Sequence, residues 1–194
     1  MVDAVNLLHD LPARDDDNLL VVVEVPAGSR VKLKYDAERE VFTWSRALTV
    51  GVSFPWDYGF VPRTRAPDGD ALDVLVYSHA GATAPGVVVP ARVIGALRVE
   101  QRRGRGPVKR NDRVLVVPAD EKLLADVADA ADLPRRAREE IEEFFRASLA
   151  LTGKDARLRG WSSAAEAERM VTAAVRRYGA GASGARARPA RRRR

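Results

Sequence analysis

The order of the hydrophobic patterns constrains the fold of this chain most strongly, because strand patterns come first and helix patterns last. Short runs that mix apolar and charged residues fill residues 19–117, and turn signals separate them. Helical spacing appears only beyond residue 120. This segregation predicts an α+β protein that is mainly β, with a small β-barrel and C-terminal helices packed against it.

Two longer helices and one shorter helix are predicted after the strands. The first begins at Pro134, a residue type that suits a first helical turn. The second begins near Ser163, where Glu166 three residues later completes a capping box. The shorter helix is expected over residues 121–130. The buried faces are predicted to be Ala137, Ile141, Phe144, Phe145 and Ser148 in one helix, and Ala167, Met170, Val171, Ala174, Val175 and Tyr178 in the other.

Composition indicates one domain, residues 1–178, followed by a basic tail. The chain has 194 residues and a net charge of +6, and its last nine residues contain six Arg and no acid. The Gly- and Ala-rich residues 179–184 read as a flexible linker. Residues 179–194 are therefore predicted to be a disordered Arg-rich tail, which could contact polyanions nonspecifically or could simply aid solubility.

Cysteine, membrane and targeting signals are missing from the sequence. The chain contains no Cys, which excludes disulfides and thiol catalysis. It has neither a membrane-length apolar run nor a signal-peptide pattern at its N-terminus. We therefore expect a cytoplasmic protein without a membrane partner.

Three aspartates within six residues give the strongest functional signal. Asp68 and Asp70 flank Gly69 in a turn, and Asp73 opens the apolar run 72–76. Three like charges held together repel one another, and divalent cations relieve this repulsion. Hard carboxylate oxygens suit Mg²⁺, with Mn²⁺ as a possible substitute. The alternative is that these Asp residues only cap a turn, since Asp-Gly is a common turn dipeptide.

Together with the segments around it, this cluster resembles soluble family I inorganic pyrophosphatases. The matching pieces run in order over about residues 5–178, and the aromatic loop before the three Asp makes the match specific. The pieces are Glu24 before Val-Pro, Lys34-Tyr35-Asp36, Arg46, the loop 54–60, the run 68–76, the Phe144-Phe145 helix and Gly160-Trp161.

The resemblance implies an OB-like five-stranded β-barrel that hydrolyses pyrophosphate to two phosphates with Mg²⁺, and a homo-oligomer of hexameric form. By resemblance, Asp68 and Asp73 bind metal, and Asp70 is the base beside the attacking water. Phosphate would be gripped by Lys34, Arg46 and Tyr58, while Glu24 and Asp36 complete an acidic rim.

The sequence departs from the family pattern at the outer part of the site. Neutral Gln101 and Asn111 stand where the family has two further metal-binding Asp, and Ser148-Leu149 replaces a phosphate-binding Tyr-Lys pair. We expect Glu100 and Asp112 to take over metal binding by a one-residue slip of a loop. The Arg-rich residues 102–110 would replace the lost Lys, unless they form only a solvated surface loop.

Two alternatives to a pyrophosphatase stay open at this stage. The scaffold could be a module that binds a phosphate ligand without turnover, or it could hydrolyse another phosphoanhydride, such as a nucleotide or short polyphosphate. Both alternatives follow from the replacements at Asn111 and Leu149, which weaken the expected metal and substrate sites.

Overall fold

Five strands close into a barrel, as the resemblance implied. The computed structural model describes residues 7–186. Its main sheet runs in the order β1-β2-β5-β6-β9-β7-β10, and an additional pairing between β2 and β7 closes the ring. The ring strands are β2 (Asn18–Val25), β5 (Asp57–Val61), β6 (Leu72–Val76), β9 (Arg113–Pro118) and β7 (Val88–Arg103).

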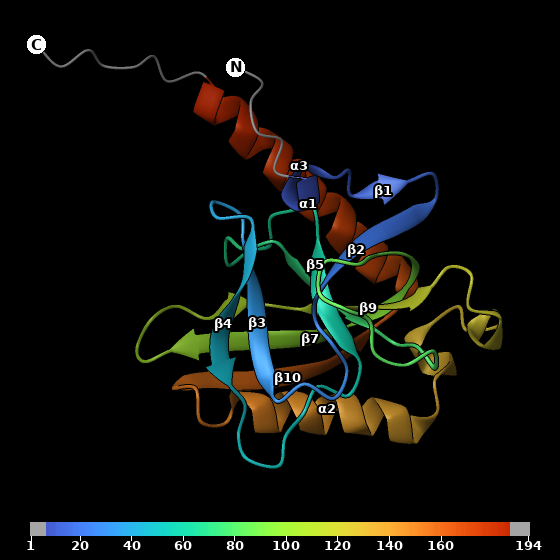
Figure 1. Cartoon of the computed structure of the whole chain (residues 1–194). Coiled ribbons are helices and arrows are strands. Elements are labelled where there is room, and N and C mark those ends of the chain that lie inside the picture. Colours follow the sequence, from blue (N-terminus) through green and yellow to red (C-terminus); the bar gives the residue numbers. More distant parts are fainter. Residues whose placement is uncertain (1–6, 187–194) are drawn as a thin grey trace, which may run out of the picture.

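The remaining strands extend or flank this barrel. A separate two-stranded sheet is formed by the hairpin of β3 (Val31–Asp36) and β4 (Val41–Ala47). Figure 1 shows this hairpin beside the barrel. The others pair with ring strands: β1 (Arg14–Asp15) with β2, and β8 (Lys109–Arg110) and β10 (Lys154–Ser162) with β7.

Two long helices pack on opposite sides of the barrel, α2 (Arg135–Leu149) below and α3 (Ala164–Arg186) above in Figure 1. Their predicted starts are confirmed. The capping box is present, since the Ser163 amide donates to Glu166 Oε2 at 3.1 Å and the Glu166 amide to Ser163 Oγ at 3.3 Å. All predicted core residues of α2 are buried, whereas Val175 of α3 is 38 % exposed.

Three local predictions were wrong. The stretch 121–130 contains no α-helix; one 3₁₀ turn, η1 (Lys122–Leu124), lies within it, and a second, η2 (Ala130–Asp132), begins at its last residue. Strand β10 lies between the two long helices, so helices do not simply follow strands. Residues 179–184, predicted to be a flexible linker, continue α3, while 187–194 of the predicted tail lie outside the described residues. At the N-terminus, α1 (Leu7–Asp10) is a single short turn.

Successive side chains along the barrel strands point alternately into two different hydrophobic clusters. On β6, Leu75 joins the cluster that packs against Ile141 and Phe145 of α2. Its neighbours Val74 and Val76 join the cluster that packs against α3. Because side chains two apart on a strand share a face, Asp73 is directed to the α2 side together with Leu75. The predicted acidic cluster therefore lies on the face of the barrel that α2 covers.

Candidate active site

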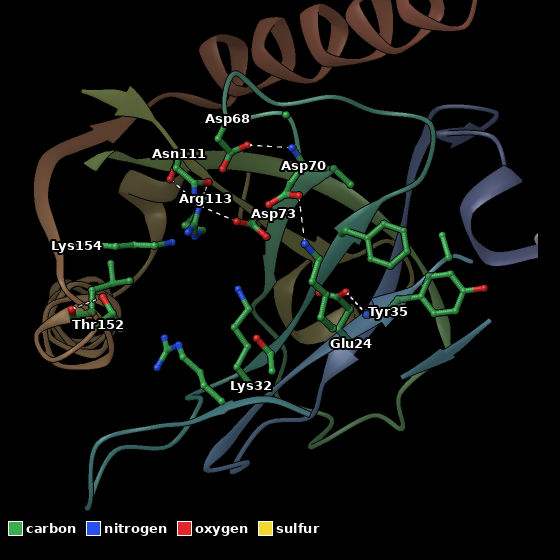
Figure 2. Close-up of a pocket in the computed structure, with 18 of the residues that line it drawn as sticks. Glu24, Lys32, Tyr35, Asp68, Asp70, Asp73, Asn111, Arg113, Thr152 and Lys154 are labelled. Carbon is green, nitrogen blue, oxygen red and sulfur yellow. Dashed lines mark hydrogen bonds and ion pairs between the residues drawn. The ribbon is translucent and has the colours of Figure 1, made fainter. Parts of the chain in front are cut away.

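A polar pocket of about 540 Å³ opens between the β3–β4 hairpin, the 66–71 turn and the end of α2. Charged side chains of both signs converge in it (Figure 2). The acidic members are four carboxylates, Glu24, Asp68, Asp70 and Asp73. The basic members are five cations, Lys32, Lys34, Arg46, Arg113 and Lys154. Neutral Asn111 and apolar Leu149 also line the pocket.

A tight turn positions the first two carboxylates. Gly69 has φ of +103°, a backbone conformation that a side chain at this position would strain. The Ala66 amide donates to the Asp70 carbonyl at 2.8 Å, and the Asp70 amide donates to Asp68 Oδ1 at 3.3 Å. Thr64 stabilises the end of the turn, where β6 begins, because its Oγ1 accepts a hydrogen bond from the Leu72 amide at 2.9 Å. The turn thus both explains the Asp-Gly pair and presents two carboxylates to the pocket.

Asp73 and Arg113 form a buried ion pair at the base of the pocket. Strands β6 and β9 run parallel with Val74 opposite Val114, which brings the preceding residues together. An Arg113 guanidinium nitrogen lies 2.8 Å from Asp73 Oδ2, and the two side chains are only 6 % and 18 % exposed. Burial alone would raise the pKa of Asp73, but Arg113, Lys32 and the hydrogen bond with Tyr58 lower it below its ordinary value. Asp73 is therefore ionised and already partnered.

The β3–β4 hairpin brings three cations to the same pocket. Lys32 and Lys34 are two residues apart on β3, so they share the face that looks into it. Lys34 Nζ lies 3.2 Å from Asp70 Oδ1, and Lys32 Nζ lies 5.3 Å from the centre of the Tyr58 ring. Lys32 stands directly opposite Arg46 on β4. Like charges in a cross-strand pair destabilise a hairpin, so this pairing favours an anionic ligand between them.

Glu24 lies beneath these cations as a buried carboxylate. It is 6 % exposed, and its Oε1 accepts the Tyr35 amide at 2.7 Å. Burial is the main cause that raises the pKa of Glu24 from 4.5 to about 7, and the nearby charge of Asp73 adds to the effect. Glu24, predicted to complete an acidic rim, does line the pocket, but as a buried side chain of strand β2.

Replacing Glu24 by Gln is expected to remove a pH dependence of stability. A carboxyl whose pKa is raised on folding favours the folded state below pH 4.5 and loses that contribution as the pH rises through about 7. The raised pKa corresponds to about 3 kcal/mol. In metal-free buffer, the unfolding free energy of the natural protein should fall by that amount relative to Glu24→Gln between pH 4 and 8. Exposed Glu38→Gln is the control, and parallel pH curves for Glu24→Gln and the natural protein would contradict the assignment.

Asp36 and Tyr58 were predicted in the site, but they are not among the residues that line the pocket. Asp36 pairs with Arg39 at 2.5 Å and accepts the amides of Glu38 and Arg39, so it caps the β3–β4 turn. Its place in an acidic rim was therefore wrong. Tyr58 is 2 % exposed and its side chain is hydrogen-bonded to Asp73, so it positions that carboxylate without lining the pocket itself.

The predicted slip of Glu100 and Asp112 into the pocket is also wrong in this structure. Glu100 lies in regular strand β7, where pairing with Arg157 and Arg110 fixes its register, and its carboxylate binds Arg159 at 2.7 Å. Asp112 accepts the Val99 amide at 3.0 Å and pairs with Arg110 at 2.6 Å. Glu100 lies in a paired strand, where a one-residue slip would turn its side chain to the other face, whereas Asp112 lies between β8 and β9 and is held by the Val99 amide and Arg110.

Of the Arg-rich residues 102–110, the described side chains of Arg102, Arg105, Lys109 and Arg110 do not line the pocket. Arg102 pairs with Asp155 at 3.0 Å and is exposed, which fits the alternative of a solvated surface segment. The additional charge in the pocket comes instead from Lys154, at the start of β10. Sequence reasoning missed Lys154 and Lys32. The alternation of β3 could have indicated Lys32, because Lys34 was already predicted in the site.

The residues present fit a divalent ion only in part. Asp68 and Asp70 offer the hard oxygens that Mg²⁺ prefers. Asp73 is committed to Arg113, and Asn111, 8 % exposed, accepts a hydrogen bond from the same guanidinium. Within residues 7–186, no group of three or more His, Cys, Asp or Glu is arranged to hold a metal ion. The donor set suits fewer divalent ions than the resemblance implies.

A closed five-stranded barrel whose pocket is lined by carboxylates and cations is typical of a protein that binds a small anion such as phosphate. Comparison with known proteins gives the family: the sequence profile described as inorganic pyrophosphatase matches residues 21–179. This chain belongs to the inorganic pyrophosphatase family.

Similar sequences and structures cover most of the chain. The inorganic pyrophosphatase of Thermus thermophilus is 38 % identical over 88 % of this chain and 97 % of its own length. That of Sulfolobus acidocaldarius is 34 % identical over 85 % and 94 %. The crystal structure of the Thermus thermophilus protein aligns with a TM-score of 0.82 at 36 % identity, covering 89 % of this chain and 98 % of that one.

Proposed function

We propose that this protein hydrolyses inorganic pyrophosphate to two phosphates with the help of divalent metal, Mg²⁺ in the first place and Mn²⁺ as a substitute. One observation carries the proposal: the pocket holds cations without ion-pair partners beside a carboxylate turn. Of its five cations, Lys32, Arg46 and Lys154 form no ion pair with any residue in 7–186. Unpaired cations facing one cavity indicate an anionic ligand, and pyrophosphate is such a ligand.

Each group of side chains has a distinct task in this reaction. Lys32 and Arg46 hold phosphoryl oxygens from the hairpin side, and Lys154 does so from β10. Asp70 accepts the proton of the attacking water at its carboxylate, because it stands at the exposed edge of the turn. Arg113 and Tyr58 fix Asp73 at the base. Bound at Asp68 and Asp70, a divalent ion would supply charge shielding of the phosphates and acidification of the water.

The test is phosphate release from pyrophosphate with Mg²⁺, without metal, and with Asp70→Asn. We expect metal-dependent turnover in the natural protein and a loss of about 10²- to 10⁴-fold in Asp70→Asn, the usual contribution of a general base. Asp155→Asn is the matched control, because this exposed aspartate pairs with Arg102 outside the pocket. Full activity in Asp70→Asn would remove Asp70 from its proposed role.

A second candidate is a phosphate-binding module or a hydrolase of another phosphoanhydride. It is favoured by neutral Asn111 and apolar Leu149 in the pocket lining. A panel of pyrophosphate, nucleotides and short polyphosphate, run beside calorimetry, separates the candidates. Tight pyrophosphate binding without turnover would favour the module, and faster turnover of another substrate would favour the alternative hydrolase.

We further propose that the protein is a homo-oligomer, hexameric as the resemblance implies, and that it is cytoplasmic. Among the described residues, no helix combines the length and apolar character needed to span a bilayer.

A further inference from the structure

A ribbon of paired strand segments outside the pocket concentrates positive charge. It consists of residues 100–110, from the end of β7 through β8, and residues 155–159 of β10, and we call it the basic ribbon. These segments contain seven Lys or Arg and two acidic residues, a formal charge of +5, although residues 1–185 as a whole are neutral. The remainder of residues 1–185 therefore carries −5. Figure 1 shows the end of β7 and the start of β10 at the left of the molecule.

Strand register places charged side chains on one face of the ribbon. Glu100 is paired with Arg110 on one side and with Arg157 on the other, and Arg102 is paired with Asp155. Paired residues share a face, and so do residues two apart on one strand, so these five side chains lie on the same face. Four of them are exposed and Glu100 is partly exposed, which makes this the outer face of the ribbon.

A small cleft of about 90 Å³ lies on this outer face. Three guanidinium groups, those of Arg102, Arg157 and Arg159, line it together with Glu100 and Asp155. Its volume is that of about three water molecules, which is enough for one phosphate group. Among the described residues, the cleft and the proposed active-site pocket have no lining residue in common.

The two carboxylates of the ribbon do not occupy its Arg side chains fully. Asp155 is shared, since it lies 3.0 Å from Arg102 and 3.7 Å from Arg157. Glu100 contacts Arg159 at 2.7 Å. All of these pairs are largely exposed, so each contributes little to stability and can exchange its partner for another anion.

The kind and number of cations distinguish this ribbon from an ordinary charged edge. Edge strands are commonly protected from pairing with other chains by charged residues, above all Lys. Here six of the seven cations are Arg, whose planar guanidinium binds a phosphate through two parallel hydrogen bonds. Arg105 and Lys109 form no ion pair with any residue in 7–186. The surplus of Arg therefore indicates a partner that carries many phosphates.

The composition of the ribbon favours duplex nucleic acid among such partners. A duplex presents one negative charge about every 1.7 Å along its axis. Proteins that bind single strands stack the bases on aromatic side chains, and neither segment of the ribbon contains an aromatic residue. Elements that bind a membrane surface combine basic residues with a broad apolar face, whereas all five register positions of the outer face are charged.

We propose that the basic ribbon binds the phosphate backbone of double-stranded nucleic acid without regard to sequence. Arg102, Arg110 and Arg157 contact phosphates from the outer face, and the cleft takes one phosphate between Arg102, Arg157 and Arg159. Contacts of this kind position a protein on a duplex and carry no sequence information. This binding goes beyond the proposed function, because the ribbon lies outside the pocket and no turnover is involved.

The test is the fluorescence anisotropy of a labelled DNA duplex of mixed sequence, titrated with the full chain between about 50 and about 200 mM salt. The double variant Arg102→Gln, Arg157→Gln removes two charges from the cleft. We expect it to bind at least about fivefold more weakly than the natural protein. The plot of log affinity against log salt should become shallower by about 2, since each lost phosphate contact removes about 0.9 from the slope.

The matched control is Arg135→Gln, Arg136→Gln at the start of α2, on the opposite side of the molecule in Figure 1. It also removes two exposed Arg charges that are paired with carboxylates. Its affinity at about 0.1 M salt should stay within about threefold of the natural protein, because charges beyond about 10 Å are screened. Both variants keep the Arg residues of 186–194. Equal weakening in both, or unchanged affinity in the ribbon variant, would overturn the proposal.

Further probes decide the kind of polyanion. A single strand of the same sequence should bind no more tightly than the duplex. Tighter binding of the single strand would overturn the assignment to a duplex. So would binding of phosphatidylserine vesicles or of inorganic polyphosphate that depends on Arg102 and Arg157, if the duplex does not bind. Thermal unfolding verifies that the variants are folded. Phosphate release from pyrophosphate should be the same in both variants and in the natural protein, so failure of the proposed function leaves this test intact.

Discussion

Replacing Arg113 by Met is expected to lower the free energy of unfolding by about 3 kcal/mol, because it leaves the Asp73 carboxylate buried without its main partner. Arg113 is 5 % exposed, pairs with Asp73 at 2.8 Å, and donates to the Asn111 carbonyl at 2.6 Å. Its guanidinium also lies 5.7 Å from the centre of the Phe145 ring on α2. One substitution therefore removes a charge pair, the hydrogen bonds to Asn111 and a contact between barrel and helix.

The same substitution should reduce pyrophosphate turnover by about a hundredfold, because a misplaced Asp73 displaces the carboxylates beside it and one pocket cation is lost. Urea unfolding and phosphate release measure the two effects. Arg102→Met is the control: both side chains of its pair with Asp155 are exposed, so the pair should contribute less than about 1 kcal/mol.

A double variant separates the ion pair from the packing. Arg113→Met with Asp73→Asn removes both charges, so it should recover at least about 1 kcal/mol of the stability lost in Arg113→Met, without recovering activity. If the double variant is less stable than Arg113→Met by the full effect of Asp73→Asn alone, the two side chains do not interact and the pair is not what holds the base of the pocket.

Asp73 could be predicted as a site residue from the sequence, but its contact with Arg113 could not. The three Asp lie within six residues, so local turn chemistry and their shared charge made them visible without a fold. Arg113 lies 40 positions after Asp73 and meets it only through the parallel pairing of β6 and β9. Register between distant strands is set by the whole barrel, and no local pattern encodes it.

In the fold, too, features with local sequence signals were predicted, and features that depend on pairing between distant strands were not. The starts of α2 and α3 were predicted because caps and apolar stripes are local signals. Strand β10 was missed because five of its nine residues are exposed and four are charged, so it has no continuous apolar pattern, and its main stabilisation is the pairing along β7. The slip of Glu100 failed for a related reason. Its segment reads as a Gly- and Pro-containing loop, yet pairing with β8 and β10 makes it a strand.

Gly59→Ala is expected to be the most disruptive single change in the barrel. A Cβ atom at this position would lie 1.9 Å from the Val22 carbonyl oxygen and 2.8 Å from its carbon, both backbone atoms of the neighbouring strand. Flexible side chains can move out of the way, but here β2 itself must shift. Gly59 pairs with Val23, next to the irregularity where β2 crosses β5. We expect a loss of more than about 4 kcal/mol, which belongs to the rare severe class of substitutions.

The consequence for function follows from what the two strands carry. Strand β2 holds Glu24 beneath the pocket, and β5 holds Tyr58, which positions Asp73. Forcing these strands apart would therefore disturb both buried groups, even in molecules that still fold. Gly179→Ala is the matched control, because Gly179 lies in helix α3 with nothing within 4 Å of an added Cβ, so alanine should stabilise the protein by about 0.5 to 1 kcal/mol. If Gly59→Ala unfolds at the same urea concentration as the natural protein, the close approach of β2 and β5 is not a requirement for closing the barrel.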